Sequence, residues 1–283
     1  MSDLTMSDLT GPDELLAEVL ARYDDAPNER LETVMQAAIR HLHAFVREVD
    51  LTRDEWMTGI QFLTATGQIC SDTRQEYILM SDTLGLSTLV EMLNYSPTDG
   101  TTENTVLGPF YAAGSPERGY GESMLDDDDR GDKVVVRGTI TDPSGTPLAG
   151  VVLDCWQSNT DGWYQVQQVD GQSDVNLRGI YRTDDHGRYE IRTVRPGKYP
   201  IPHDGPVGAL LKANNRGWMR PGHLHTWVKH PGFKELITHI FDRQSDHLYD
   251  DAVFGVRESL IVDFTEDADG ELSATFDFVL DPA

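Results

Sequence analysis

Two histidines separated by one residue, His223 and His225, end the segment RPGHLH at residues 220–225. Side chains alternate in direction along a β-strand, so such a pair on a strand points both imidazoles to one face. Two imidazoles alone suit many metals, and zinc is the default ion for them. Two phenolates, from Tyr164 and Tyr199, would favour a hard, highly charged cation such as Fe(III). The combination predicts an iron site inside a β-rich domain.

Each of these signals is weak when taken alone. A tyrosine in a β-sandwich is usually a core residue whose hydroxyl is hydrogen-bonded. Tyr164 ends the loop at 159–164, just after a predicted strand, and Tyr199 follows the turn at 195–198. Because binding sites are commonly built on loops that a rigid scaffold positions, these places favour a functional role for both tyrosines.

The second half of the sequence has the residue pattern of short β-strands. Apolar and polar residues alternate, and turn sequences such as Asp142-Pro143-Ser144-Gly145 separate the runs. This pattern predicts a β-sandwich. The turn at 184–187 is interpreted as the connection of a hairpin between 180–183 and 188–192. The other predicted strands are 134–141, 151–157, 223–230, 236–241, 260–264 and 272–279.

The first half of the sequence has the period of helices. Apolar residues from Leu31 onward recur at helical spacing after Asn28. Thr52 and Glu55 have the spacing of a capping box at the start of another helix. A further helical run covers 74–94, although Gly85 interrupts it.

The predicted fold class is therefore α+β, with helices first and a mainly antiparallel β-sandwich second. We expect a helical dimerisation domain at 12–105 and a catalytic β-sandwich domain at 106–283. Residues 1–11, which contain a repeated acidic pentapeptide, are predicted to be a disordered extension.

Composition narrows the classes of function. The formal net charge of −25 argues against nucleic-acid binding, whereas a neutral aromatic substrate would not be repelled. No run of 18 apolar residues exists, so no membrane span is expected. The two distant cysteines, Cys70 and Cys155, fit a reducing cytoplasm, and the acidic N-terminus lacks the features of a secretory signal. A cytoplasmic location is the expectation.

The residues also carry a family resemblance. The segment 134–264 resembles the intradiol ring-cleaving dioxygenases, non-haem Fe(III) enzymes that open catechols between the two hydroxylated carbons. The N-terminal helices resemble the linker domain of the catechol and hydroxyquinol branch, which the protocatechuate branch lacks. The matching motifs, in the order of the family, are LGPF at 107–110, DGWY at 161–164, NLRG at 176–179, RTD at 182–184 and RPGHLH at 220–225.

The resemblance implies that Tyr164, Tyr199, His223 and His225 bind Fe(III), with a solvent hydroxide as the fifth ligand. An Fe(III) ion with two phenolates and one hydroxide is neutral overall, and a buried site tolerates neutrality far better than net charge. In the family the second tyrosine, here Tyr199, leaves the iron and helps to remove the substrate proton. Tyr199 is therefore expected to be catalytic as well.

Arg220 lies three residues before His223. The ordinary interpretation of an arginine is a surface salt bridge. We favour a catalytic role, because a fixed cation beside the iron would stabilise negative charge that develops in the transition state.

The segments 79–82, 198–208 and 251–256 look like those of the hydroxyquinol (benzene-1,2,4-triol) enzymes. An aspartate at the pocket wall, Asp82, would bind a third ring hydroxyl and discriminate against catechol. The alternative interpretation is that Asp82 caps a helical turn near Gly85. The resemblance implies a substrate pocket lined by Leu79, Asp82, Val106, Leu107, Gly108, Pro109, Phe110, Ile201, Pro202 and Val253.

The expected activity is cleavage of hydroxyquinol with O2 to 3-hydroxy-cis,cis-muconate, which tautomerises to maleylacetate, in the catabolism of aromatic compounds. The alternative within the family is a catechol 1,2-dioxygenase that forms cis,cis-muconate. The resemblance also implies a homodimer formed through the helices, which in this branch can hold a phospholipid between the subunits.

Two positions depart from the family pattern. Gly222 stands where alanine is common, which should be tolerated but loosen the strand. His239 stands where catechol enzymes usually carry glutamine, and it could hydrogen-bond a ligand without being a fifth protein ligand.

Two other classes of protein remain open. The segment 138–150 has the look of a transthyretin-like sandwich used for binding, which needs no metal. A zinc hydrolase would need a carboxylate beside His223 and His225, and none has compelling spacing.

Overall fold

The computed structural model of the chain describes residues 11–24, 26–71, 74–95, 100–126, 130–167, 172–268 and 270–283. The predicted disordered extension lies outside the described residues, apart from Gly11. Residue contacts divide the chain into two compact units, Met1–Ala65 and Thr66–Ala283. The two units are described separately below.

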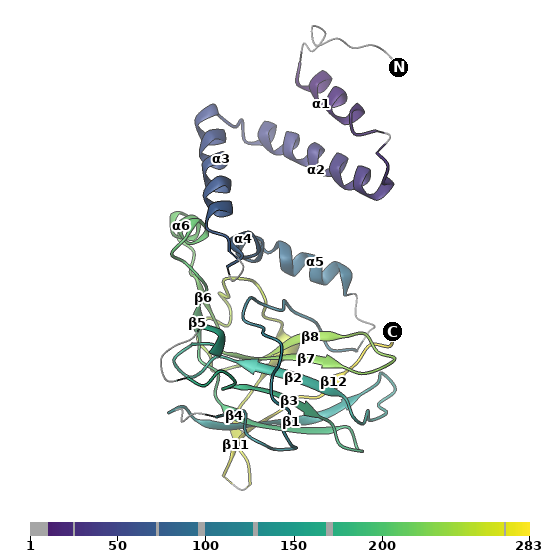
Figure 1. The fold of residues 1–283 in the computed structure, drawn as a ribbon, viewed down its shortest axis with the longest axis vertical. Coiled ribbons are helices and arrows are strands. Elements are labelled where there is room, and N and C mark those ends of the chain that lie inside the picture. Colours follow the sequence, from purple (N-terminus) through teal and green to yellow (C-terminus); the bar gives the residue numbers. More distant parts are fainter. Residues whose placement is uncertain are drawn as a thin grey trace. The chain divides into compact units, whose positions relative to one another are not determined.

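The first unit is helical. It contains α1 (Pro12–Ala21), α2 (Glu29–Glu48) and most of α3 (Arg53–Gln68) (Figure 1). The predicted start of α2 is confirmed, because the Asn28 side chain accepts a hydrogen bond from Leu31 N at 3.1 Å. The capping box is confirmed as well: Thr52 N donates to the Glu55 carboxylate at 2.9 Å, and Glu55 N donates to Thr52 Oγ1 at 3.3 Å. No helix in the described part of the chain has the length and apolar character needed to cross a membrane.

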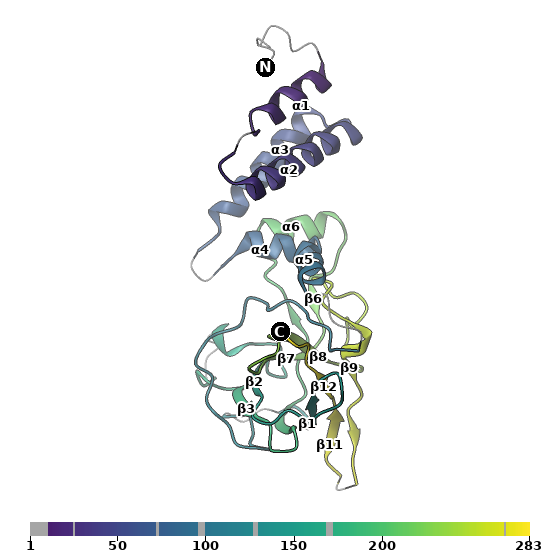
Figure 2. The same ribbon diagram turned by 90° about the vertical axis from the view of Figure 1, so that its right-hand side faces the viewer.

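Three helices belong to the second unit: α4 (Glu76–Thr83), α5 (Leu86–Asn94) and α6 (Pro206–Ala213). They lie together in Figure 2, where α4 contacts both α5 and α6. Gly85 separates α4 from α5 with a φ of 73°, a conformation that glycine adopts easily. Glu76, fully buried, accepts a hydrogen bond from Val207 N at 3.1 Å. Such contacts place α4 and α5 in the same compact unit as the sheets, although the sequence analysis grouped 12–105 as one helical domain.

Two layers of strands form the rest of this unit (Figure 1). Among the strands of the described residues, pairing is antiparallel except at three places: between β1 (Lys133–Thr141) and β11 (Leu272–Thr275), between β1 and β12 (Phe278–Val279), and between β8 (Leu236–Asp242) and β9 (Ile261–Val262). The prediction of a mainly antiparallel sandwich after a helical region is confirmed. In the described residues, one sheet has the order β3 (Arg178–Arg182), β2 (Val152–Gln157), β7 (His223–Lys229), β8 (Leu236–Asp242), β9 (Ile261–Val262). The other has the order β10 (Thr265–Glu266), β11 (Leu272–Thr275), β1 (Lys133–Thr141), β12 (Phe278–Val279), with β4 (Arg188–Val194) paired to β1.

The predicted hairpin at 184–187 is wrong. The turn itself forms, with Asp184 Oδ1 accepting from His186 N and from Arg188 N, both at 2.9 Å. However, β3 pairs with β2 and β4 pairs with β1, so the turn carries the chain from one sheet to the other. Tyr181 and Tyr189 both lie in the core, because each strand buries its own face between the layers.

The faces of the central strands decide where a site can lie. The core between the sheets contains Leu153 and Cys155 of β2 together with Leu224 and Val228 of β7. Side chains alternate along a strand, so Trp156 of β2 and His223 and His225 of β7 face the other way. That outer face carries a separate cluster around Trp156, Tyr164 and Tyr199. The candidate ligands therefore lie on the outside of the sandwich sheet and not in its core.

Candidate metal centre

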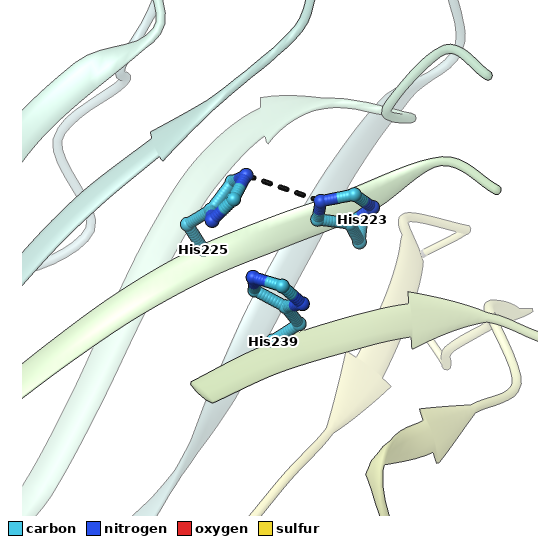
Figure 3. Close-up of side chains that lie close together, drawn as sticks. All are labelled: His223, His225 and His239. Atoms are coloured by element: carbon cyan, nitrogen blue, oxygen red, sulfur yellow. Dashed lines mark hydrogen bonds between the residues drawn. The ribbon is translucent and has the colours of Figure 1, made fainter. Parts of the chain in front are cut away.

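The two histidines of the His-x-His motif lie on one face of β7, as predicted (Figure 3). Their Nε2 atoms are 3.1 Å apart, and both side chains are buried. His239 of β8 pairs with His225 across the two strands and brings a third imidazole to the same face.

Tyr164 reaches this face from the loop that follows β2. The loop turns tightly: Asn159 Oδ1 accepts from Trp163 N at 2.9 Å, and Gly162 has a φ of 86°. A Cβ at Gly162 would collide with the carbonyl oxygen of Lys198, so this turn requires glycine. The Tyr164 hydroxyl lies 2.9 Å from His225 Nε2.

Tyr199 reaches the site from β5 (Tyr199–Pro200), which pairs with β6 (Met219–Arg220). The register sets Tyr199 opposite Arg220, and Arg220 Nη1 donates to the Tyr199 hydroxyl at 3.1 Å. The same Nη1 atom lies 3.5 Å from His223 Nε2. The structure thus brings the four predicted ligands and the predicted catalytic arginine together.

Aromatic rings surround the four side chains. Trp156 stacks on His225 with ring centroids 4.6 Å apart, and Phe110 stacks on Tyr164 at 4.5 Å. A Cβ on Gly108 would lie 3.4 Å from His225 Cε1, so the 106–110 segment passes close to the imidazole. Trp156 carries no signal of this role in the sequence, because its position beside His225 follows from the pairing of β2 with β7.

Arg220 has a buried partner that the sequence analysis also missed. Asp251 binds it through two contacts, Nε to Oδ1 at 3.0 Å and Nη2 to Oδ2 at 3.3 Å. Gly255 N also donates to Asp251 Oδ2 at 2.8 Å. Arg220 is 2% exposed, so the interpretation as a surface salt bridge is excluded. Asp251 begins the segment 251–256 that resembles the hydroxyquinol enzymes, but with 48 acidic residues in the chain nothing in the sequence indicates that it pairs with Arg220.

Burial governs the protonation of the candidate ligands. It raises the pKa of Tyr164 well above its usual value, and the neighbouring Tyr199 adds to the effect. It raises the pKa of Tyr199 as well, although Arg220 opposes the shift. Burial and Arg220 lower the pKa of His223 to about 3, and burial lowers the pKa of His225 well below its usual value. The imidazoles are therefore neutral, and the phenols need a nearby cation to ionise near neutral pH.

The donor set fits a metal ion. His223 Nδ1 lies 2.7 Å from the carbonyl oxygen of Pro221, which can only accept, so the Nδ1 hydrogen points there and the Nε2 lone pair points to the site. Nitrogens that each bind one ion at about 2.1 Å and at right angles lie ~3 Å apart, close to the spacing observed here. In the described residues, His223, His225 and His239 bring ligand atoms within 4.8 Å of one another. The two phenols add hard oxygen donors, which favour Fe(III).

For the predicted substrate pocket, the structure gives the burial of each residue but no contact with a substrate. Asp82 is buried on α4, and burial raises its pKa while the charge of Arg220 opposes the shift. It therefore lies within electrostatic reach of the site. Contact with a bound ring remains a prediction for the whole set. Within it, Leu79, Val106, Ile201 and Val253 are buried, Leu107, Gly108, Phe110 and Pro202 are half-buried, and Pro109 is exposed.

Gly222 is explained by a close approach of two backbone segments. A Cβ there would collide with the carbonyl oxygen of Pro196. The alanine that is common in the family therefore does not fit this backbone, and glycine is needed for the contact. Glycine is thus accommodated at this position, in agreement with the expectation that it would be tolerated.

Known proteins are similar to this chain over nearly its whole length. Residues 106–282 match the family described as Dioxygenase, and residues 28–102 match the family described as Catechol dioxygenase N terminus. The chain is 46% identical to 6-chlorohydroxyquinol 1,2-dioxygenase of Cupriavidus pinatubonensis, over 95% of this chain and 96% of that protein. It is 46% identical to hydroxyquinol 1,2-dioxygenase of a Rhizobium species, over 92% of this chain and 88% of that protein. The crystal structure of hydroxyquinol 1,2-dioxygenase from Pseudomonas putida superposes with a TM-score of 0.92 at 44% identity, over 96% of this chain and 99% of that one.

These matches define the class of the protein as a ring-cleavage dioxygenase. The chain belongs to the intradiol dioxygenase family.

Proposed function

We propose that the protein is an intradiol dioxygenase that cleaves hydroxyquinol with O2 and forms 3-hydroxy-cis,cis-muconate, the tautomer of maleylacetate. Identity of 46% to a hydroxyquinol 1,2-dioxygenase and to a 6-chlorohydroxyquinol 1,2-dioxygenase, over nearly the whole chain, carries the choice of substrate. Both oxygen atoms of O2 would enter the product as the bond between the two hydroxylated carbons breaks.

We propose that Tyr164, Tyr199, His223 and His225 hold Fe(III). The ion would supply Lewis acidity, which would activate the aromatic ring of the substrate for reaction with O2. The support is the convergence of two phenol oxygens and two imidazole nitrogens on one buried point. Tyr199 would accept a substrate proton as a phenolate, and its oxygen already accepts a hydrogen bond from a fixed cation, Arg220.

Arg220 is proposed to stabilise negative charge that develops on the substrate. The guanidinium is buried and held from behind by Asp251, so it needs no reorganisation during the reaction. Nη1 is the atom that faces Tyr199 and His223.

Asp82 is proposed to select the third ring hydroxyl. A buried carboxyl that is left without a partner by catechol would disfavour that ring, whereas the extra hydroxyl of hydroxyquinol would donate to it. Its burial, and its electrostatic contact with Arg220, support this role.

Oxygen uptake with hydroxyquinol, catechol and protocatechuate tests the substrate assignment. We expect hydroxyquinol to give the highest kcat/KM, with the product identified by its absorption. In Asp82→Ala the ratio of hydroxyquinol to catechol should fall at least tenfold, while Asp185→Ala, at an exposed turn, should leave it unchanged. Faster turnover of catechol by the unaltered protein would instead favour a catechol 1,2-dioxygenase.

Colour tests the metal. Tyrosinate bound to Fe(III) absorbs visible light, so concentrated protein should be red-brown and lose colour and activity together when iron is removed. A colourless protein that contains zinc would favour a hydrolase, and one without any metal would favour a binding sandwich.

We propose that the chain forms a homodimer through its helical part, which leaves 106–283 to catalysis. The family matches, which end at residue 102 and resume at 106, support this functional division. Exposed apolar side chains recur at helical spacing along α2, as expected for a surface that a second copy covers. They are Leu31, Val34, Leu42, Phe45 and Val46, and α3 adds Trp56, Met57 and Ile60.

Sedimentation tests this assembly. We expect a dimer at micromolar concentration, and a Leu42→Glu change should convert it to monomer without abolishing activity. A phospholipid between the subunits would appear in an organic extract of the purified dimer and be absent from that of the monomeric variant. Monomer alone in the unaltered protein would overturn the proposal.

A cytoplasmic location is also proposed, and the two distant cysteines support it.

A further inference from the structure

Arg216 follows the end of α6, and the helix end fixes its backbone. Asn215 has a left-handed φ of 53°, and its N donates to Lys212 O at 3.1 Å. Arg216 N donates to Leu211 O at 2.9 Å. This pair of bonds around a left-handed residue closes the C-terminal end of many helices. The half-buried side chain of Arg216 is thereby directed from a rigid base toward other elements.

The guanidinium of Arg216 joins two segments that are far apart in the sequence. Its Nη1 donates to Thr83 O at 2.5 Å, and its Nη2 donates to Ala252 O at 3.2 Å. Thr83 is the last residue of α4, so its carbonyl is one of those that a helix leaves without a partner of its own. Thr83 and Ala252 are each 1% exposed, and a buried carbonyl that loses its donor is costly. One planar fork thus caps α4 and holds the 251–256 segment.

The 251–256 segment needs such a hold, because it contains a strained residue. Phe254 has a φ of 59°, which is costly for a bulky side chain and persists only where the surroundings enforce it. The Arg216 guanidinium lies over the Phe254 ring, 4.8 Å from its centroid. A Cβ on Gly85 would lie 3.5 Å from the same ring, so Phe254 also packs on the junction of α4 and α5. An open cavity of about 550 Å³, lined in part by Arg216, Phe254 and Val256, gives the segment room to move if these contacts are lost.

The two segments that Arg216 joins carry predicted walls of the substrate pocket. Asp82 directly precedes Thr83 on α4, and Val253 directly follows Ala252. The side chains of Asp82 and Val253 are both buried. Arg216 therefore bonds to the neighbour of each wall residue, and its fork sets how far apart the two backbones lie.

We propose that Arg216 is a positioning residue for substrate specificity: it holds α4 and the 251–256 segment at a fixed spacing and so places Asp82 and Val253 around the bound ring. The inference deepens the proposed function and rests on it, because it takes these two side chains to line the hydroxyquinol pocket. Arg216 acts through them and not on the ring itself. A displacement of about 1 Å by a change far from the chemistry can cost about a hundredfold in rate, so a residue that fixes this spacing affects selectivity.

A purely structural role would have Arg216 stabilise the whole compact unit by capping α4. That role predicts lower stability throughout the unit and no change in the choice of ring. Positioning predicts loosening that is confined to two segments, together with weaker discrimination between rings.

Arg257 offers a matched control, because it is a second half-buried arginine that contacts the same segment. Its Nη1 donates to Phe254 O at 3.1 Å and to Val256 O at 3.0 Å. In the part of the chain that the structure describes, its side chain makes no hydrogen bond to α4. Arg257→Met therefore removes an arginine from the segment and leaves the bridge to α4 in place.

Amide hydrogen exchange of the full-length protein tests the hold without any reaction. In Arg216→Met we expect exchange at least about tenfold faster in peptides that cover 79–85 and 251–256, and unchanged exchange in β1 and β7. Arg257→Met should leave the 79–85 peptide unchanged. Arg216→Lys keeps the charge but replaces the planar fork by one nitrogen, so it should change the same two peptides less. This variant carries the test if Arg216→Met does not fold.

Oxygen uptake tests the effect on the pocket. We expect Arg216→Met to raise KM for hydroxyquinol more than it lowers kcat, and to reduce the hydroxyquinol-to-catechol ratio of kcat/KM about three- to tenfold. Because Arg216 acts through Asp82, the same change in an Asp82→Ala background should alter the ratio by less than about twofold. Arg257→Met should keep the ratio of the unaltered protein.

Equal ratios in Arg216→Met and Arg257→Met would overturn the inference. So would an additive fall of the ratio in the double variant, or faster exchange throughout the unit, which would indicate a general loss of stability. An unaltered protein that consumes no O2 with hydroxyquinol or with catechol would instead refute the proposed function, and amide exchange would still show whether Arg216 holds the two segments together.

Discussion

The core between the sheets and the outer face of β2, β7 and β8 each bury tyrosines, and they use them differently. Tyr189 in the core donates to the carbonyl oxygen of Phe276 at 2.6 Å, whereas Tyr199 on the outer face receives a hydrogen bond from Arg220. Burial is the main cause that raises the pKa of both phenols. The two tyrosines therefore share burial and direction of pKa shift and differ in their neighbours. Convergence with imidazoles and a cation, more than burial, marks a functional tyrosine.

The tyrosine pair gives the most demanding test of this comparison. Tyr199→Phe should lower kcat about a hundredfold or more, because it removes a proton-accepting ligand, with little loss of stability. Tyr189→Phe should leave kcat unchanged and reduce the free energy of unfolding by about 1–2 kcal/mol, because it unpairs the carbonyl of Phe276. Oxygen uptake and urea unfolding measure the two effects. An exchange of the two outcomes would invert the roles assigned to the faces.

The buried ion pair belongs to the outer face and should be costly to break. Asp251→Asn leaves the Arg220 charge buried and unpaired, so we expect a loss of about 3–5 kcal/mol in the free energy of unfolding together with lower kcat. Asp263→Asn is the matched control, because Asp263 pairs with Arg243 at 3.1 Å on the surface. It should cost at most about 1 kcal/mol. Similar losses in both variants would mean that Asp251 does not hold the arginine.

Leu224 lies between the candidate ligands His223 and His225 on β7, but its side chain points into the core, whereas theirs point to the outer face. Leu224→Ala should reduce the free energy of unfolding by about 2–5 kcal/mol through the cavity that it leaves. Iron per folded molecule, measured by metal analysis after removal of aggregates, should stay near that of the unaltered protein. A variant that keeps its stability and loses its iron would show that the faces are not independent.

The stability of the metal-free protein should depend on pH through the buried histidines of the outer face. Burial lowers the pKa of His223 to about 3 and those of His225 and His239 well below the usual 6.5. The unfolded chain therefore binds more protons than the folded one below about pH 6.5, and stability falls as the pH drops from there toward 3. Each proton contributes a slope of about 1.4 kcal/mol per pH unit. Urea unfolding between pH 7 and 4.5 measures how the free energy of unfolding changes with pH. This free energy should fall less steeply with decreasing pH in His239→Gln than in the unaltered protein, and an equal fall in both would contradict the buried neutral state of His239.

Local patterns were sufficient for most elements of the fold. Period-two alternation and turn chemistry predicted β1, β2, β7 and β8, and side-chain capping predicted the starts of α2 and α3. The turn at 184–187 was also recognised, but its hairpin pairing was wrong. Whether two strands joined by a tight turn pair with each other depends on where each one buries its face, and residues far away in the sequence decide that.

The site divides along the same line. Strand alternation placed His223 and His225 on one face, and the family motifs added Tyr164, Tyr199 and Arg220. The family pattern also drew attention to His239, but only the strand register sets it opposite His225. The partner of Arg220, Asp251, is one of 48 acidic residues and was not predicted as such. A periodic pattern or a motif involves only a few neighbouring residues, so it can be recognised in the sequence alone. The partner of a buried polar group is chosen by tertiary contacts, because the chain must satisfy each such group with whatever the fold brings beside it.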